Sequence, residues 1–317
     1  MNEIYSSINH HLGAHRFTHH AMATVFEIFI IHDDATYARQ AAGAAFEELD
    51  RLEQELSRYI ETSDISRINH LPAHQSLRIG LTTWECLQQC SKLNEETVGA
   101  FDITIGPLLN YWRSQKNGNN HSADEEFNNA RRHSGFHLLV LEEEHHTIQL
   151  KASPMTLDLG GYGKGYAIDR MADLLRDWDI DCALIHGGKS TALALDAPPE
   201  TDGWSLTINH PVSKERTLMN CHLKNQSISA SGIRKGRHII DPRNAKPITG
   251  RIAAWSYAAT AATADALSTA FMIMPPNEIK NFCLQHPHTS ALIIVEDETS
   301  KQGREAIHRF GCWEQCG

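Results

Sequence analysis

The stretch Thr156–Gly188, TLDLGGYGKGYAIDRMADLLRDWDIDCALIHGG, decides the fold around it. It opens with a glycine-dense turn that carries Asp158 and Lys164, six residues apart. Apolar residues then recur at helical spacing over Tyr166–Trp178, and the apolar run Cys182–His186 is typical of a strand. Such a turn at the start of a helix can cradle a phosphate ester, because backbone N–H groups, the helix N-terminus and a cation converge there.

The glycine spacing excludes two familiar nucleotide-binding motifs. The turn lacks the Walker spacing before Gly-Lys-Ser or Gly-Lys-Thr, and its glycines do not fit the dinucleotide pattern G-x-G-x-x-G. These glycines are Gly160, Gly161, Gly163 and Gly165. From the residues alone, a phosphate cradle and a tight strand-to-helix turn with a solvated lysine both remain open.

Helices and strands are mixed along the chain without a regular βαβ order. Apolar spacing predicts further helices over residues 36–56, 82–97 and 263–274. Short apolar runs predict strands over residues 25–31, 147–150, 155–159, 204–209 and 291–295, and residues 57–69 are expected to form turns. This mixture favours an α+β fold of mixed sheets with flanking helices over a doubly wound sheet.

Length and composition suit one large domain or two closely joined ones. The chain has 317 residues, of which 41% are hydrophobic, enough for a sizeable core. No Pro- or Gly-rich linker divides it, so we predict a single domain over residues 1–317 with a core from about 18 to 295. The polar segment 114–132, with its Asn-Gly-Asn-Asn run, is expected to be a mobile surface loop or an insertion.

Charge and hydropathy exclude several classes of partner. The net charge is −10 and no basic patch carries interleaved aromatics, so we expect no nucleic-acid partner. No apolar run is long enough for a membrane span, and the sequence before Thr18 has no apolar signal segment, so we expect a cytoplasmic protein. The seven scattered cysteines do not indicate a disulfide framework, and the twenty histidines show no zinc-ligand spacing.

A second candidate site lies in the predicted helix 263–274. Asp265 and Thr269 are four residues apart and therefore share a face, which we expect to lie away from the buried stripe that includes Leu267 and Phe271. A carboxylate and a hydroxyl are hard oxygen ligands suited to Mg²⁺. An aspartate near a helix start is also often a cap, so both interpretations stay open.

Three further polar positions can serve chemistry. His238 and Asp241 are separated by two apolar residues and can both reach one cleft from a strand end, and histidine is the usual proton carrier near neutral pH. Asp102, beside Phe101, can read a base edge or a sugar, and Tyr59 can stack on a flat ring. The alternatives are a structural histidine, a capping aspartate and an aromatic that covers the core.

The chain carries a series of short sequence blocks, several of them described above, over most of its length, from about Thr18 to Val295. The blocks are Met22-Ala23-Thr24, Tyr59, Ser63–Asn69, Ala100-Phe101-Asp102 with Gly106-Pro107, Asp158–Gly161 with Lys164-Gly165-Tyr166, Gly187-Gly188, Ser231-Gly232, His238–Pro242 and Ala264–Thr269. In this order they resemble the FAD:protein FMN transferases, the ApbE family.

The resemblance implies an α+β, T-fold-like domain that binds FAD with Mg²⁺. Such enzymes split the pyrophosphate of FAD, attach FMN through a phosphoester bond to a Thr or Ser of an acceptor protein, and release AMP. Residue by residue, it implies an FAD site lined by Met22, Tyr59, Ala100, Phe101, Asp102, Asp158, Lys164 and His238. It also implies that Asp265, Thr269 and the carbonyl of Gly161 hold Mg²⁺. His238 would be catalytic, and the acceptor hydroxyl needs a base, for which His238 and Asp241 both qualify.

The chain departs from the family pattern at three places. Ala23 stands where the family usually has glycine, Lys189 stands where it commonly has Asp or Asn, and Asn244-Ala245 replaces the usual Thr-Gly. Losing that last glycine is expected to alter a turn beside the histidine. The departures leave an alternative function open, in which the protein binds FAD, or hydrolyses it with Mg²⁺ to FMN and AMP, without a protein acceptor.

Overall fold

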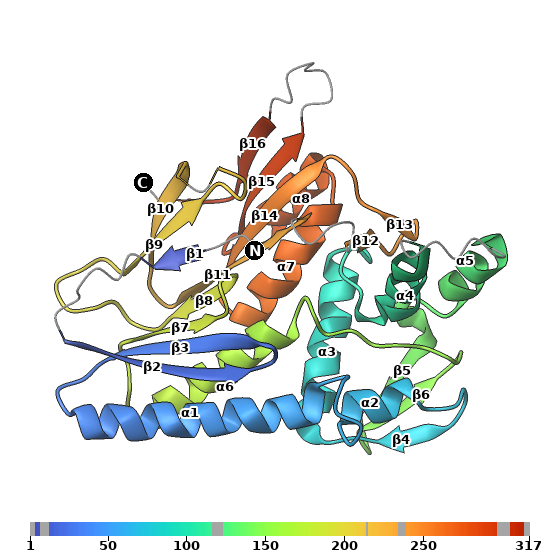
Figure 1. Ribbon diagram of the computed structural model, residues 1–317, viewed down its shortest axis with the longest axis horizontal. Helices are drawn as coiled ribbons and strands as arrows, with labels where there is room; N and C mark the ends of the chain where they lie inside the picture. The colour runs from blue at the N-terminus through green and yellow to red at the C-terminus, as the bar shows by residue number, and fades with distance from the viewer. Residues whose placement is uncertain are drawn as a thin grey trace. The chain divides into compact units, whose positions relative to one another are not determined.

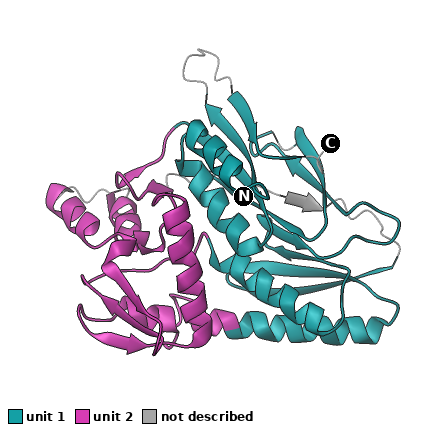
Figure 2. Cartoon of the chain, turned by 180° about the vertical axis from the view of Figure 1, so that it is seen from behind, with its two compact units in different colours: residues 1–51, 162–235, 250–317 teal, residues 52–161, 236–249 magenta. Residues whose placement is uncertain are grey.

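The computed structural model describes residues 4–6, 13–115, 123–213, 215–233, 239–296 and 305–313 (Figure 1). The chain divides into two compact units (Figure 2). Unit 1 comprises residues 1–51, 162–235 and 250–317, and unit 2 comprises residues 52–161 and 236–249. Our prediction of a single domain over residues 1–317 stays a prediction.

An eight-stranded antiparallel sheet forms the centre of unit 1. In spatial order its strands are β16 (Glu305–Phe310), β15 (Ser290–Glu296), β14 (Arg251–Ala258), β11 (Gln226–Gly232), β8 (Thr191–Ala194), β7 (Ala183–Gly187), β3 (Thr24–Ile31) and β2 (Ala14–Ala21). A second sheet contains β1 (Ile4–Ser6), β9 (Trp204–Asn209) and β10 (Thr217–Leu223). Every strand pairing in the described residues is antiparallel, which confirms the α+β class.

The two faces of the large sheet are covered differently. Strand β9 buries every second side chain, and Trp204 and Leu206 pack with Trp255 of the large sheet in one apolar cluster. The opposite face is covered by α6 (Gly163–Asp177) and α7 (Ala261–Ile273), which pack against each other (Figure 1). The two remaining helices of this unit are α1 (Ala35–Leu56), which continues into unit 2, and α8 (Pro276–Gln285).

Unit 2 combines short helices with a small antiparallel sheet. Its helices are α2 (Asp64–Asn69), α3 (Leu81–Glu96), α4 (Gly106–Gln115) and α5 (Ala123–Arg132), with the 3₁₀ turns η1 (Ile103–Ile105) and η2 (Phe136–Leu138). Its strands are β4 (Ser76–Arg78), β5 (Leu139–Glu142) and β6 (Thr147–Leu150), and β12 (Ile240–Asp241) pairs with β13 (Lys246–Pro247). No helix in the described part of the chain is both long and apolar enough to cross a membrane.

Three local predictions in unit 2 are wrong. Residues 64–69, expected as turn, form helix α2, because Ser63 caps it by accepting the N–H of Ser66. Residues 155–159, expected as a strand, pair with no strand, and the backbone of Leu157 bonds to the side-chain amide of Asn69 instead. Residues 123–132 of the expected loop form helix α5, whose Phe127 packs against α4. Residues 116–122 lie outside the described part.

Candidate functional site

The register of the large sheet places three hydroxyl side chains in one row. Thr191 of β8 pairs with Ser229 of β11, and Ser229 pairs with Ser256 of β14. All three residues are buried. Gly187 of β7 continues the row, and a Cβ at that position would lie 2.8 Å from Ile168 of α6. The row therefore faces the helices rather than the apolar cluster on the opposite face.

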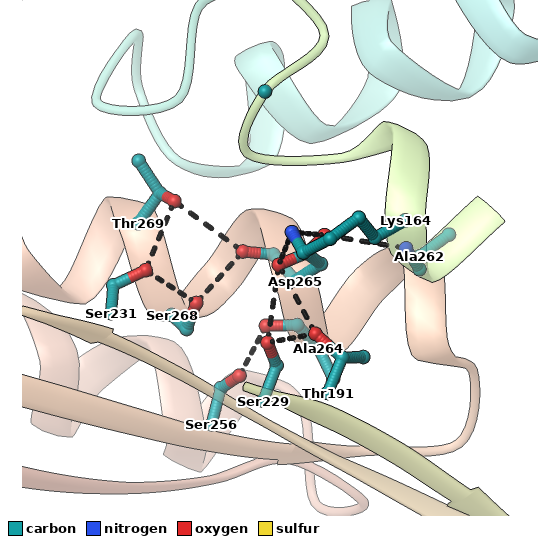
Figure 3. A network of polar contacts seen from close by, with 12 residues as sticks. Lys164, Thr191, Ser229, Ser231, Ser256, Ala262, Ala264, Asp265, Ser268 and Thr269 are labelled. Carbon is teal, nitrogen blue, oxygen red and sulfur yellow. Dashed lines mark hydrogen bonds and ion pairs between the residues drawn. The ribbon is translucent and has the colours of Figure 1, made fainter. Parts of the chain in front are cut away.

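Asp265 of α7 contacts this row of hydroxyls (Figure 3). Its Oδ1 accepts from Ser229 Oγ at 3.2 Å and from Thr191 Oγ1 at 3.4 Å. Its Oδ2 accepts from Lys164 Nζ at 3.0 Å and from the N–H of Gly165 at 3.2 Å. Only 3% of Asp265 is exposed, and a carboxylate buried this deeply needs a counter-charge and hydrogen bonds. Lys164 supplies the charge, and the other three groups supply the bonds.

We had expected Asp265 to lie on an outer face of its helix, but it does not. Helix α7 packs against β11, β14 and α6, so its polar and apolar sides are both buried. Nor does Asp265 cap the helix. Thr260 is the N-cap, and Asp169 of α6 accepts from the N–H groups of Ala261 at 2.7 Å and Ala262 at 2.8 Å. The capping interpretation of Asp265 is therefore excluded.

Thr269 extends the same polar network by one helical turn. Its Oγ1 lies 3.3 Å from Ser231 Oγ, and Ser231 Oγ lies 2.8 Å from Ser268 Oγ. Figure 3 shows these hydroxyls beside Asp265 on the face of α7 that meets β11. The structure thus brings together Lys164, Asp265 and Thr269, of which the first two are 101 residues apart in the sequence. It adds a wall of serine and threonine hydroxyls to them.

In unit 2, Arg58 joins two of the predicted FAD contacts. Its guanidinium forms an ion pair with Asp158 at 3.1 Å and donates to the Tyr59 hydroxyl at 2.9 Å. It also covers the Tyr59 ring, 4.9 Å from the ring centre, although 81% of Tyr59 is exposed. Burial lowers the pKa of Arg58, but the charge of Asp158 and the bond to Tyr59 outweigh it and leave that pKa raised. Asp158 additionally accepts from the N–H of Gly160 at 2.8 Å, in the same turn as Gly161.

Asp102 acts as a cap, which is the structural alternative that the sequence left open. Its Oδ1 accepts from the backbone N–H and the hydroxyl of Thr104, at 2.8 and 2.7 Å, at the start of η1. Its Oδ2 accepts from the N–H of Phe136 at 3.2 Å. Burial raises the pKa of Asp102 above its ordinary value, although these bonds oppose the rise. The neighbouring Ala100 and Phe101 are buried, and the Phe101 carbonyl accepts from the Asn94 amide.

Met22 lies in a turn between β2 and β3 beside the second Gly-Gly pair. Met22 and Ala23 have φ angles of 49° and 58°, the left-handed pair of a two-residue hairpin turn. Gly188 has a φ of 64°, and a Cβ on it would lie 2.6 Å from the hydroxyl of Thr24. Lys189, which follows Gly188, is exposed. Within unit 1, the Met22 turn and the segment that carries Lys189 are therefore neighbours.

Asp241 is held by the residues that follow it. Its oxygens accept from the backbone N–H and the guanidinium of Arg243 and from the Asn244 amide. Ala245 keeps a left-handed φ of 62°, and its N–H donates to the Asp241 carbonyl at 2.8 Å. The turn thus keeps the conformation that glycine would favour, contrary to our expectation that losing the glycine alters it. His238, the predicted catalytic residue, lies outside the described residues.

Sequence reasoning missed several residues of these clusters. The serines of β11 alternate with apolar residues in Ser-Ile-Ser-Ala-Ser, which is a strand signal with one polar face. Arg58 is adjacent to Tyr59, yet nothing local shows that it pairs with Asp158, 100 positions further on. Asp169 lies five residues after Lys164 on α6, and its partners belong to another helix. These contacts are tertiary and have no local signature.

Comparisons with known proteins identify the family of this chain. The sequence model of the ApbE family matches residues 22–293. The FAD:protein FMN transferase of Buchnera aphidicola subsp. Schizaphis graminum is 27% identical over 267 residues, covering 80% of this chain and 78% of the relative. That of Escherichia coli K12 is 25% identical over 296 residues, covering 88% and 84%.

Solved structures show the same architecture. The flavin transferase ApbE from Vibrio cholerae superposes with a TM-score of 0.82 at 22% identity, covering 95% of this chain and 98% of that one. The ApbE protein from Thermotoga maritima gives a TM-score of 0.79 at 25% identity, covering 94% and 97%. These likenesses confirm the predicted fold. With the family match over residues 22–293, they establish that this chain belongs to the ApbE family.

Proposed function

We propose that this chain is an FAD:protein FMN transferase. A Thr or Ser hydroxyl of an acceptor protein attacks the FMN phosphorus of FAD, the bond to the AMP phosphate breaks, and AMP leaves while the hydroxyl proton passes to a base. Family membership and the relatives named for this activity support the proposal. The structural observation that carries it is the ion pair between Lys164 and the buried Asp265 carboxylate, with the row of strand hydroxyls beside it, because breaking a pyrophosphate requires fixed groups that handle phosphate charge.

Lys164 has the placement for phosphate contact. It is the second residue of α6, so its ammonium and the helix N-terminus are close together in the chain. Its Nζ is 3.0 Å from Asp265 Oδ2, and the side chain is partly exposed. An ammonium on a flexible stem can turn from a carboxylate to a phosphate, and there it stabilises charge on the departing AMP.

The residues around Asp265 fit Mg²⁺ in their donor chemistry. The carboxylate is surrounded by neutral hydroxyl oxygens, and hard oxygens are the ligands that Mg²⁺ prefers. The Lys164 ammonium already contacts this carboxylate, so a positive charge beside Asp265 is compatible with the surrounding groups, which supports the proposal. We therefore assign Asp265 and Thr269 to Mg²⁺, and we keep the Gly161 carbonyl as the further ligand that the family resemblance implies. When bound, the ion would neutralise phosphate charge.

Another metal site is not supported in the described residues. The one group of three metal-ligand side chains found there is Glu142, Glu144 and His145, in the exposed turn between β5 and β6. Glu142 already accepts bonds from the backbone of that turn and from Thr147. An acidic turn that satisfies itself in this way needs no ion.

The other residues that the resemblance places in the FAD site remain proposed FAD contacts, and the structure supports some of them more than others. Those contacts are Met22, Tyr59, Ala100, Phe101, Asp102, Asp158 and His238. The exposed Tyr59 ring can stack on a flat ring system. Asp102 has its oxygens engaged in capping, so any ligand contact adds to that role. We assign the base to His238 rather than Asp241, because Arg243 and Asn244 occupy both oxygens of Asp241.

Incubation with FAD, Mg²⁺ and a purified acceptor domain that presents an exposed Thr or Ser tests the function. We expect AMP and FMN-labelled acceptor in equal amounts, measured by chromatography and intact-protein mass spectrometry. The acceptor with that Thr changed to Val is the matched control and should stay unlabelled. Free FMN plus AMP without any labelled acceptor would establish the FAD-hydrolysis alternative. No FAD cleavage with any acceptor would overturn both transfer and hydrolysis and leave only FAD binding.

Variants of the enzyme separate the assigned roles. His238→Ala should abolish labelling while FAD binding persists. Asp265→Asn keeps the volume of the side chain but removes its charge, so transfer should fall at least about 100-fold and the response to Mg²⁺ should weaken. An Asp265→Asn enzyme with an unchanged Mg²⁺ response would overturn the metal assignment.

We also propose a cytoplasmic location, which the cysteines support. Cys86 and Cys90 lie one helical turn apart on α3 as buried thiols, and none of the cysteines in the described segments forms a disulfide. Proteins of reducing compartments keep such thiols. Cell fractionation with an antibody against the chain tests the location, and recovery outside the cytoplasm would contradict it.

A further inference from the structure

Asp169 connects the helix that carries Lys164 to the helix that carries Asp265. It lies in the second turn of α6 and its two oxygens each accept one backbone N–H of α7, from Ala261 at 2.7 Å and Ala262 at 2.8 Å. Both bonds are short and charge-assisted, which makes them stronger than neutral hydrogen bonds. One carboxylate on α6 therefore holds the first turn of α7.

The N-terminus of α7 depends on this carboxylate. A helix begins with N–H groups that have no partner inside the helix. In α7, Thr260 Oγ1 accepts the N–H of Thr263, and the Thr260 carbonyl accepts the N–H of Ala264. The two N–H groups before these belong to Ala261 and Ala262, and Asp169 is the acceptor for both. Without it, the first turn of α7 would have to shift or fray to find water.

The two helices also approach each other too closely to adjust independently. A Cβ on Gly165 would lie 2.2 Å from the carbonyl oxygen of Ala261, so only glycine fits there. The N–H of Gly165 bonds to Asp265, and Lys164 pairs with the same carboxylate. Besides this close approach, polar contacts from Lys164, Gly165 and Asp169 link α6 to the first two turns of α7. Those of Lys164 and Gly165 go to Asp265, whereas those of Asp169 go to the backbone of Ala261 and Ala262.

We propose that Asp169 is a positioning residue: by fixing the start of α7 against α6, it sets the distance between the Asp265 carboxylate and the Lys164 ammonium. The inference rests on the proposed function, since it gives that distance a role in holding Mg²⁺ and phosphate. Residues that orient metal ligands in this way commonly change metal affinity 10- to 100-fold when they are replaced. Asp169 itself touches neither of the two groups that it positions.

Two substitutions of graded severity test the proposal. Asp169→Asn keeps one oxygen acceptor for the two N–H groups, and Asp169→Ala keeps none. Titration of the FAD-free protein with Mg²⁺ by calorimetry should show affinity falling about 10-fold for Asn and further for Ala. With FAD and acceptor present, excess Mg²⁺ should restore kcat for Asp169→Asn to near the wild-type value, with KM for FAD unchanged.

Asp173→Asn is the matched control on the same helix. Asp173 is partly exposed, and it forms ion pairs with the nearby Arg170 and Arg176 of α6. This variant should bind Mg²⁺ like the wild type. If the melting temperature of both Asp169 variants falls but their Mg²⁺ affinity equals that of the wild type, Asp169 only stabilises the fold and the proposal is overturned. The calorimetric measurement does not require transfer, so failure of the proposed function would show separately, as a wild-type protein that does not label its acceptor.

Discussion

The two units hold their polar groups in opposite ways. In unit 1, Asp265 is buried on a helix over a row of strand hydroxyls, so regular backbone fixes every partner. In unit 2, Arg58, Tyr59 and Asp158 lie in turns, and the Tyr59 ring is exposed. A buried carboxylate held by regular backbone suits a small hard cation, whose ligands must be placed closely. An exposed ring on a turn suits a flat ligand that it can follow.

Removing the charge of Lys164 should break the buried cluster most severely. Lys164→Met leaves the Asp265 carboxylate unpaired, and losing one partner of a buried pair costs about 3–5 kcal/mol. Urea unfolding at neutral pH measures the loss. Mg²⁺ should restore more stability to this variant than to the wild type, because the ion then supplies the missing charge.

The control is Lys224→Met, which breaks an exposed pair with Asp196 and should cost at most about 1 kcal/mol. If both variants lost the same free energy of unfolding, the Lys164–Asp265 pair would stabilise the protein no more than an exposed pair does.

Acid should act on unit 1 through His186. Burial lowers the pKa of this imidazole from 6.5 to about 4, so between these values only the unfolded chain takes up the proton. The free energy of unfolding should therefore fall by about 3 kcal/mol as pH drops from about 6.5 to 4. His186→Leu should remove that part of the pH dependence in urea titrations. A variant with the slope of the wild type would contradict this assignment.

Substitutions of the exposed Tyr59 in unit 2 should change the affinity for FAD rather than the free energy of unfolding. Tyr59→Ala should weaken FAD affinity about 10-fold, since stacking on an aromatic contributes about 1–3 kcal/mol. Tyr59→Phe should retain most of the affinity, and the free energy of unfolding should change little in either variant. Fluorescence titration with FAD measures the effect. Unchanged affinity in Tyr59→Ala would remove this residue from the FAD site.

The smallest effect concerns two alanines in left-handed turns, one in each unit. Ala23 is exposed at φ 58°, so Ala23→Gly should relieve strain and stabilise the protein by up to about 1 kcal/mol. Ala245 has a similar φ of 62° but is buried, so Ala245→Gly also loses about 0.8 kcal/mol of methyl packing. Thermal unfolding of both variants should therefore show a gain for Ala23→Gly and almost none for Ala245→Gly.

The sequence predicted elements where one physical signal dominates. Strand β3 has an apolar run broken only by Glu27, and helix α6 has apolar residues at i, i+3, i+4 and i+7; both were predicted closely. Strand β11 was missed although its serines alternate with apolar residues, because its apolar face consists of only two residues, Ile228 and Ala230. Helix α2 is too short to show a period, and only its Ser63 cap marks it.

The sequence predicted several members of the polar cluster around Asp265 but not their environment. Lys164, Asp265 and Thr269 were identified from their chemistry and from the family resemblance, and the structure brings them together. That Asp265 is buried was not predictable, because a helical face looks polar or apolar only relative to the neighbours that cover it. The Arg58–Asp158 pair depends likewise on tertiary contact.

Because the serines of β11 alternate with apolar residues, the polar cluster around Asp265 forms only when this strand pairs in the correct register. Ser229 and Ser231 point towards α7, while Ile228 and Ala230 point into the apolar cluster on the other side. Sliding this strand by a single residue would exchange the two sets, pressing hydroxyls into the core and turning Ile228 towards Asp265. A mispaired sheet would therefore be both unstable and inactive. The serines of β11 therefore serve both the correct pairing of the strand and the polar cluster around Asp265. A change that disturbs one of these roles also disturbs the other.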